Sequence, residues 1–419
     1  MPLDPARHFE TEEGPQGALA ALRSLPRNVW VVTLTSFLTD VSSEMLASLL
    51  PLYLKNVIGA GTTAIGLIEG VAETTASLLK LASGWLSDKV GNRKWLAVAG
   101  YALSLVAKPL LFLVTSWPGV LGYRFTERVG KGVRTAPRDA LVAASTPRSR
   151  RGLAFGVHRA GDTAGAVVGL TVAFAVVWWC LGAGGALDRP VFLTLVGVSL
   201  IPAALGVLSL AFGAREVNPP APERAAPETS SRPLGRSFRR FLGITLLFTL
   251  GNSSDAFLVL RAQQAGLSLL GVLGMMITFN VVYAAVSGPA GSLSDRVGRR
   301  KLIITGWLVY SLIYLGFAWA RSGAQVWFLM TFYGVYYAAT EGVTKAYVAD
   351  LVPPERRGTA YGLWNALIGI SALPASLIAG LLWEKIGPSA TFSFGALLAT
   401  IAAALLTLSP ATIPSDHEG

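Results

Sequence analysis

The chain is dominated by apolar stretches of about 20 residues, which recur from Val29 to Leu408. An α-helix needs this length to cross a hydrocarbon core that is about 30 Å thick. Only 14% of the 419 residues are charged and 52% are hydrophobic, whereas a soluble domain has about a quarter charged residues. Because water cannot accommodate so much apolar surface, we predict an all-α integral membrane protein.

Charged residues and Gly/Pro breaks divide the apolar sequence into successive segments. They predict twelve transmembrane helices, near residues 28–53, 64–86, 95–115, 119–143, 152–178, 191–213, 238–262, 268–293, 301–321, 325–350, 357–383 and 388–409. A stretch rich in Pro, Ala, Ser and charge follows the sixth, and we interpret it as a flexible linker. The predicted organisation is an N-terminal tail (1–27), a six-helix bundle (28–213), the linker (214–237), a second six-helix bundle (238–409) and a C-terminal tail (410–419). Residues 1–27 lack the apolar core of a signal peptide, so the first stretch is expected to remain as a span.

The two halves of the sequence repeat one another. GWLSDKVGNRK at 84–94 recurs as GSLSDRVGRRK at 291–301, and TPRSRRGLAFG at 146–156 recurs as VPPERRGTAYG at 352–362. Both pairs fall in the second and fourth interhelical loops of their halves. TDVSSEM at 39–45 has a weaker echo in GNSSDAF at 251–257. Such repeats predict two pseudo-symmetric bundles with a site at their interface.

Basic residues give the expected orientation. The formal net charge is +11, but the Lys and Arg residues lie mostly in alternate short loops and in the linker. A nucleic-acid-binding protein would gather them on one soluble face. Because Lys and Arg stay on the cytoplasmic side of membranes, we predict that both termini are cytoplasmic and that no nucleic acid is bound.

The repeated element G-x-L-S-D-[KR]-x-G-x-R-[RK] resembles the loop signature of the major facilitator superfamily, and the resemblance covers the whole chain. It implies a monomeric transporter of the bacterial inner (plasma) membrane that carries a small solute by alternating access. It also implies that the repeated loops latch the cytoplasmic side. The expected gate residues are Gly84, Asp88, Arg93, Lys94, Gly291, Asp295, Arg299 and Arg300. The alternative is a static charged loop that only obeys the positive-inside bias.

The fourth predicted helix carries an unusual basic stripe, formed by Arg124, Arg128, Lys131, Arg134 and Arg138 at helical spacing. Each base facing lipid would cost roughly 2.5–3.5 kcal/mol, so the stripe is expected to face a wet cavity or acidic partners. R-V-G-K-G at 128–132 is similar to the family element R-x-x-Q-G, with Lys131 in place of Gln. In the family, that Arg is associated with proton coupling.

Carboxylates at membrane depth are the natural partners of these bases. The candidates for proton coupling, with Arg128, are Asp40, Glu44, Glu69, Glu73, Glu127 and Asp162. Two carboxylates four residues apart share a helix face, and at low dielectric they favour proton uptake unless a base lies between them. We predict that a proton is released when this site meets Arg128. The alternative is a structural ion-pair network.

Polar and aromatic residues in the apolar stretches supply candidates for a substrate cavity, since buried polar groups in membranes are functional candidates. They are Arg124, Lys131, Arg134, Asn252, Asp255, Asn280, Tyr283, Tyr337, Trp364 and Asn365. Glu341 and Lys345, four apart, are predicted to form an internal pair. In the fifth helix, Gly156, Gly161, Gly165 and Gly169 permit tight packing. The Gly-Pro ending usual in drug–proton antiporters is absent, because Leu170 follows Gly169.

Several function classes are disfavoured by the sequence. It has no P-loop spacing, which predicts an ion gradient and not ATP as the energy source. The single cysteine, Cys180, allows no disulfide or zinc site, and no catalytic constellation or cofactor motif is evident. The leading hypothesis is proton-coupled efflux of small organic compounds, with protons, solute and lipid as partners. The alternatives are an importer of an anionic solute and a non-transporting sensor or assembly factor with the same fold.

Overall fold

The computed structural model describes residues 21–217, 234–353 and 356–410, without the side chains of residues 88, 148 and 291–295. Every regular element in these ranges is helical. The elements are α2 (Arg27–Ala47), α3 (Leu50–Asn56), α4 (Thr62–Val90), α5 (Arg93–Ala107), α6 (Leu110–Leu113), α7 (Trp117–Ser145), η1 (Arg148–Arg150), α8 (Arg151–Leu181), α9 (Arg189–Leu208), η2 (Ser209–Gly213), α10 (Arg236–Gly251), α11 (Ala256–Gln264), α12 (Leu269–Val297), α13 (Arg299–Trp319), α14 (Gly323–Asp350), α15 (Arg357–Lys385) and α16 (Pro388–Leu408).

Eight helical segments in the described ranges are long and apolar enough to cross a membrane. They are Arg93–Leu113, Arg151–Leu181, Arg189–Gly213, Arg236–Gln264, Leu269–Ala290, Arg299–Trp319, Arg357–Lys385 and Pro388–Leu408. The other long helices, α2, α4, α7 and α14, contain most of the charged residues that the sequence places at membrane depth. Their lower hydropathy therefore reflects groups that face the interior of the protein, as described below.

Three of the predicted helices are interrupted. The predictions of unbroken helices over 28–53, 95–115 and 238–262 were wrong, because breaks separate α2 from α3, α5 from α6, and α10 from α11. Pro51 and Pro109 lie at the first two breaks and lack the N–H that an interior helix position donates. At the third break, 252–255 reads Asn-Ser-Ser-Asp, whose side chains compete for backbone hydrogen bonds.

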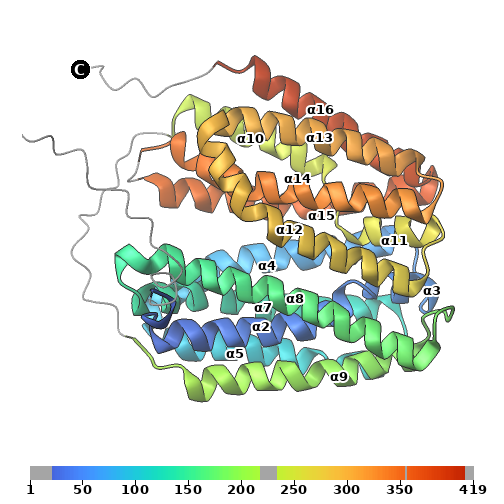
Figure 1. The fold of residues 1–419 in the computed structure, drawn as a ribbon, viewed down its shortest axis with the longest axis horizontal. Helices are drawn as coiled ribbons and strands as arrows, with labels where there is room; N and C mark the ends of the chain where they lie inside the picture. The colour runs from blue at the N-terminus through green and yellow to red at the C-terminus, as the bar shows by residue number, and fades with distance from the viewer. Residues whose placement is uncertain (1–20, 218–233, 354–355, 411–419) are drawn as a thin grey trace, which may run out of the picture.

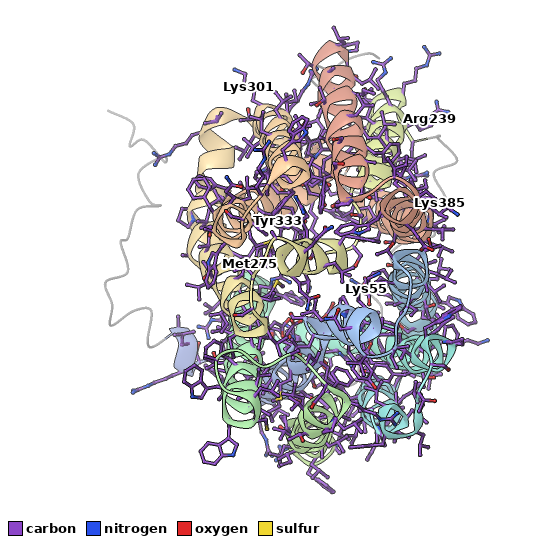
Figure 2. All side chains as sticks on the ribbon, turned by 90° about the vertical axis from the view of Figure 1, so that its right-hand side faces the viewer. Lys55, Arg239, Met275, Lys301, Tyr333 and Lys385 are labelled. Carbon is purple, nitrogen blue, oxygen red and sulfur yellow. The ribbon has the colours of Figure 1, made fainter. Side chains whose placement is uncertain are left out.

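The helices form two groups along the chain. Figure 1 shows α2 to α9 in the lower part of the view and α10 to α16 in the upper part, with the long helices running roughly parallel to one another. The groups meet where α4 packs on α15, α8 on α12, and α3 on α11. We call the right-hand end of Figure 1, which contains α3 and α11, the α3/α11 end. Figure 2 looks onto this end, where Lys55 of α3 and Lys385 of α15 come from different groups.

Glycines allow α4 and α15 to approach closely near the α3/α11 end. A Cβ atom added to Gly66 would lie 2.2 Å from the carbonyl oxygen of Ser376, and one added to Gly380 would lie 2.5 Å from that of Thr62. Small residues at such crossings let helix backbones touch within a membrane. Gly84, one of the expected gate residues, makes no such close approach, because the nearest neighbour of an added Cβ would be Ala136 Cβ at an ordinary 3.5 Å.

The predicted glycine packing of the fifth helix is confirmed for three of its four positions. Cβ atoms added to Gly161, Gly165 and Gly169 of α8 would lie 2.5 Å from atoms of α2, whereas Gly156 has open space around it. The outer surface of the helices is apolar, with exposed side chains that include Trp179, Phe212 and Leu312. An exterior of this kind suits lipid contact and not water.

Candidate functional site

A cavity of about 410 Å³ lies between the two groups of helices. The first group contributes residues of α2, α3, α4 and α7, and the second contributes α12, α14, α15 and the break between α10 and α11. The polar lining residues are Glu44, Ser48, Glu69, Glu73, Ser77, Arg124, Arg128, Thr249, Asn252, Ser253, Ser254, Asp255, Tyr333, Tyr337 and Ser376. The interrupted helix thus places its irregular Asn252–Asp255 segment against a polar space, where its backbone groups are tolerated at membrane depth.

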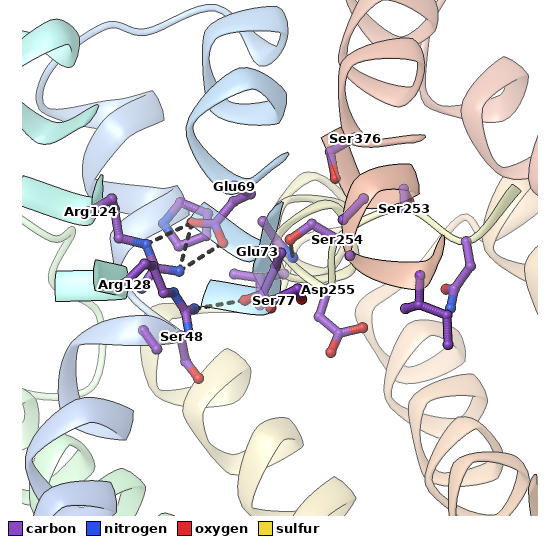
Figure 3. A pocket seen from close by; sticks show the side chains of 18 of the residues that line it. Ser48, Glu69, Glu73, Ser77, Arg124, Arg128, Ser253, Ser254, Asp255 and Ser376 are labelled. Atoms are coloured by element: carbon purple, nitrogen blue, oxygen red, sulfur yellow. Dashed lines mark hydrogen bonds and ion pairs between the residues drawn. The ribbon is translucent and has the colours of Figure 1, made fainter. Parts of the chain in front are cut away.

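Two acid–base pairs join α4 to α7 inside the first group (Figure 3). Arg124 donates from Nη2 to Glu69 Oε2 at 2.7 Å and from Nε to Oε1 at 3.2 Å, with both side chains 7% exposed. Arg128 Nη2 lies 2.9 Å from Glu73 Oε1. The two glutamates are four residues apart on α4, and the two arginines are four residues apart on α7. Because each set lies on one face of its helix, two parallel helices bring both pairs together. Arg124 and Arg128 of the basic stripe therefore face carboxylates, as predicted.

Glu127 adds a third carboxylate to the two guanidinium groups. Its Oε2 lies 3.5 Å from Arg124 Nη1 and 3.4 Å from Arg128 Nε. At these distances Glu127 Oε2 makes no hydrogen bond, but its charge still attracts both guanidinium groups. Arg124 and Arg128 are therefore neutralised from several sides by the protein itself, which leaves little positive charge for a ligand.

Glu44 also lines a smaller cavity of about 70 Å³, together with Asp40, Lys131 and Arg134 and with Arg124, Glu127 and Arg128 of the network. Neither Glu44 nor Asp40 forms an ion pair with any residue whose side chain is described. Arg134 donates to Ser104 Oγ at 2.8 Å and lies over the Tyr101 ring, with its Cζ 4.6 Å from the ring centre. Glu44 is therefore an unpaired carboxylate that reaches both cavities.

Asp255 is the corresponding group of the second half. It stands at the N-cap position of α11 but makes no capping hydrogen bond, and Tyr333 donates from its hydroxyl to Asp255 Oδ1 at 3.1 Å. Figure 3 shows Asp255 beyond Glu69 and Glu73, on the side away from the two arginines. No ion pair to Asp255 occurs within the described part of the chain. The positive N-terminal end of a helix favours a carboxylate at this position.

Asp162 belongs to a separate polar cluster between α2, α5 and α8. His158 Nδ1 lies 3.5 Å from Asp162 Oδ2, and His158 Nε2 is 3.0 Å from Ser36 Oγ. The Ser36 hydroxyl also lies 3.1 Å from Tyr101 Oη. Asp162 lines neither of the two cavities.

The structure brings only part of the predicted substrate cavity together. Arg124, Asn252, Asp255 and Tyr337 line the 410 Å³ cavity, and Lys131 and Arg134 line the smaller one. Four predicted residues line neither of them: Asn280, Tyr283, Trp364 and Asn365. Asn280 donates to the carbonyl of Met276 one turn back in its own helix, and Trp364 is 6% exposed. Sequence reasoning missed Tyr333 and the lining serines, of which Ser253 and Ser254 stand beside Asp255 in the GNSSDAF echo.

Tyr283 instead takes part in a contact between the two groups of helices. Arg159 of α8 donates to Glu341 Oε2 of α14 at 3.1 Å and to the hydroxyl of Tyr283 of α12. That hydroxyl donates to Glu341 Oε2 at 2.7 Å. Lys345 also donates to Glu341, at 3.1 Å, which confirms the predicted internal pair. No local pattern predicts the longer-range contact, because its members are separated by up to 182 residues.

The described gate candidates contact neighbouring loops and helix ends. Glu216 accepts hydrogen bonds from the backbone N–H groups of Arg93 and Lys94 at 3.1 and 2.7 Å. Arg299 lies 2.5 Å from Asp350, and Arg300 donates to Leu406 O at 2.6 Å at the end of α16. The side chains of Asp88 and Asp295 and the surroundings of Gly291 in α12 lie outside what the structure describes. No cluster of His, Cys, Asp or Glu with metal-binding geometry occurs in the ranges that the structure covers.

An all-helical protein with an apolar exterior and a charged cavity between two groups of helices has the architecture of a polytopic membrane transporter. The Major Facilitator Superfamily model matches residues 32–277 and 241–418. The chain therefore belongs to the Major Facilitator Superfamily, as the loop signature predicted.

Relatives support the same assignment. An uncharacterized MFS-type transporter of Methanocaldococcus jannaschii is 38% identical over 392 residues, which are 92% of this chain and 95% of that protein. The multi-drug resistance efflux pump PmrA of Streptococcus pneumoniae is 26% identical over 344 residues, or 78% of this chain and 82% of the pump. A solved POT family transporter in complex with 5-aminolevulinic acid has a TM-score of 0.74 at 14% identity, covering 91% of this chain and 96% of that one. This last likeness concerns the fold alone.

Proposed function

We propose that this chain is a proton-coupled secondary transporter that exports small organic compounds across the plasma membrane by alternating access. In this proposal α2, α4, α7 and α14 also span the bilayer, which gives twelve spans in two six-helix bundles. The bundles comprise residues 28–213 and 238–409, joined by a cytoplasmic linker. The distribution of Lys and Arg supports cytoplasmic termini and, with them, an outward-facing α3/α11 end.

The observation that best supports proton coupling is that Glu44 forms no ion pair with any described side chain. It lies beside a network in which each carboxylate already contacts an arginine. Glu69, Glu73 and Glu127 each lie against a guanidinium group, so each of them already has a basic partner within the first group of helices. Glu44 lacks such a partner and reaches both cavities. We therefore place proton binding at Glu44, with Asp40 in the same small cavity as its neighbour, and assign Arg124 and Arg128 to hold the network.

Two sets of contacts supply the gates of an alternating-access cycle. At the α3/α11 end, Glu384 accepts from the backbone N–H of Thr63 at 2.9 Å, and farther along the same two helices, at the depth of the cavity, Thr74 donates to Gly369 O at 2.7 Å. Toward the other end, Arg159 and Glu341 join the two groups. Both sets must break and reform if the bundles rock about the cavity.

Export is supported by the relationship to PmrA, which is a multi-drug resistance efflux pump. The importer of an anionic solute is less well supported, because carboxylates already pair with Arg124 and Arg128.

A pH gradient across proteoliposomes tests the proposal. Solute uptake driven by an acidic lumen is expected for an exporter inserted inside-out, and uptake driven by an acidic exterior would instead indicate symport.

The third hypothesis, a sensor or assembly factor, predicts no flux in either gradient. The names of the relatives indicate only a broad class of candidate solutes. The first experiment is therefore a screen of candidate ligands for thermal stabilisation of the purified chain. A ligand that binds the folded protein raises its apparent stability. Proton-independent flux of every ligand found would contradict the proposed coupling.

A further inference from the structure

We propose that a groove between α10 and α16 binds an anionic phospholipid, with the phosphate at Arg240 and Arg236 and an acyl chain along Leu405. The groove shares no lining residue with the two cavities described above. The proposal goes beyond transport, because a lipid bound on the outside of the second half requires neither proton coupling nor export.

The groove has a volume of about 470 Å³ and lies where the start of α10 packs beside the end of α16. Figure 1 shows this place at the end of the molecule opposite the α3/α11 end. Both helices belong to segments that are long and apolar enough to cross a membrane, Arg236–Gln264 and Pro388–Leu408. Their ends therefore lie at the boundary between acyl chains and headgroups, where a phospholipid presents both of its parts.

The walls of the groove are apolar. Gly243 and Ile244 line it from α10, and Leu405 and Leu408 line it from α16. Leu405 is 43% exposed and Leu408 is 81% exposed. A Cβ atom added to Gly243 would meet no atom within 4 Å, so the missing side chain leaves open space beside Ile244. An apolar strip with open space along it suits an acyl chain and offers little to a polar solute.

The rim of the groove is basic. Arg236, Arg239 and Arg240 at the start of α10 are all exposed, and none of them forms an ion pair with a described side chain. The neighbouring helices add no negative charge, because α10, α13 and α16 contain neither Asp nor Glu. The positive-inside rule accounts for bases at a helix end, but it does not account for an apolar groove beside them.

Two of these arginines share one face of α10 with the groove. Arg236 and Arg240 are four residues apart, which is about 6 Å along the helix axis, and Arg240 lines the groove itself. A guanidinium group forms paired hydrogen bonds with phosphate oxygens, and basic segments beside a membrane attract anionic lipids. The charge of the rim is therefore complementary to a phosphodiester with no compensating cation.

Arg300 of α13 has a different part, because it fixes the wall of the groove. It donates to the carbonyl of Leu406 at 2.6 Å and also to the carbonyl of Ser409. The last carbonyls of a helix lack partners within the helix, so these bonds hold the end of α16 in place. Leu408 and Ser409, which line the groove, are thereby positioned before a lipid arrives, and such preorganisation favours binding.

Lipids that differ only in headgroup charge test the proposal. Binding of phosphatidylglycerol and of phosphatidylcholine with identical acyl chains is measured by native mass spectrometry on the purified, delipidated full-length chain. We expect the phosphatidylglycerol to bind at least about fivefold more tightly. Glycerol phosphate, which has no acyl chain, is expected not to displace it at equal concentration. Equal binding of the two lipids, or displacement by glycerol phosphate, would overturn the proposal.

Charge variants locate the headgroup. Arg240→Gln is expected to weaken binding of phosphatidylglycerol by about fivefold, whereas Arg240→Lys keeps the charge and most of the affinity. Arg321→Gln is the matched control, because Arg321 is an exposed arginine at the other end of α13. Unchanged affinity in Arg240→Gln, or an equal loss in Arg321→Gln, would contradict the assignment.

A variant that fills the groove tests the place of the acyl chain. Gly243→Leu changes no charge and is expected to weaken lipid binding at least as much as Arg240→Gln. Gly122→Leu is its control, since an added Cβ at this glycine of α7 also meets no atom within 4 Å. Equal lipid affinity in Gly243→Leu and Gly122→Leu would show that the chain lies elsewhere.

The acidic end of the chain is the competing occupant of the groove, because Asp416 and Glu418 follow α16 closely in the sequence. Asp416→Asn/Glu418→Gln in the full-length chain is expected to leave the affinity for phosphatidylglycerol unchanged. A clear gain in lipid affinity in this double variant would mean that the acidic segment covers the rim, which would overturn the proposal.

Discussion

Arg128 Nη2 lies 2.9 Å from Glu73 Oε1, and the Glu73 side chain is 46% exposed to its surroundings. The base for which the sequence suggested a role in proton release is thus already engaged by a carboxylate one turn beyond Glu69. Proton release at Glu44 on meeting Arg128 would require this pair to break. We therefore assign Arg128 to the network and Glu44 to the proton.

The Arg124–Glu69 pair is expected to stabilise the first half of the protein. Arg124→Met leaves Glu69 buried without its bidentate partner, which costs about 3–5 kcal/mol in comparable buried pairs. Thermal unfolding of the purified variant in detergent should show a clearly lowered Tm. The double variant Arg124→Met/Glu69→Met removes both charges and is expected to recover most of the loss. A single variant as stable as the parent would show that the pair contributes little.

Closure at the α3/α11 end depends on Gly66. Gly66→Ala places a Cβ atom 2.2 Å from the Ser376 carbonyl oxygen, so α4 and α15 must separate there. A cysteine introduced at Ser77, in a chain with Cys180→Ser, is then expected to react with an impermeant thiol reagent from this end. Gly122→Ala is the control, since no atom lies within 4 Å of an added Cβ. Equal reactivity in both variants would argue against a tight seal at Gly66.

The contact of Arg159 with Glu341 is expected to hold the opposite side together. Arg159→Gln removes the charge that joins α8 to α14, while the Lys345–Glu341 pair within α14 remains. Spin labels on α8 and α14 should report a longer mean separation in this variant, and Arg159→Lys should preserve the parent distance. An unchanged distribution of distances between the two spin labels in Arg159→Gln would show that the contact does not hold the helices together.

The sequence predicted the approximate positions of the long helices because the apolar stretches are long and are separated by charged or Gly/Pro-rich loops. It does not predict the breaks near Ser48 and Lys108, because Pro51 and Pro109 lie within otherwise uninterrupted apolar stretches. The Arg124–Glu69 pair was accessible in principle, because acids and bases share a four-residue spacing on two helices. The contact of Arg159 with Glu341 and the participation of Tyr333 depend on packing between distant segments, which no local pattern reports.

The exclusion of Trp364 and Asn280 from the cavity lining has the same cause. Each residue is polar or amphipathic at apolar depth, so the sequence marks it as a candidate. Which face of the helix meets the cavity depends on how α12 and α15 rotate against their neighbours. Asn280 finds its partner in its own helix, a local solution that makes a ligand unnecessary.

The central claim is that the unpaired carboxylate of Glu44 carries the coupled proton. Its most direct test compares two modes of solute movement in proteoliposomes that contain the Glu44→Gln variant. Solute exchange between equal pH on both sides needs no net proton movement and is expected to continue. Accumulation driven by a pH gradient is expected to fall to the level of protein-free vesicles. Parent-level accumulation in Glu44→Gln would contradict the account.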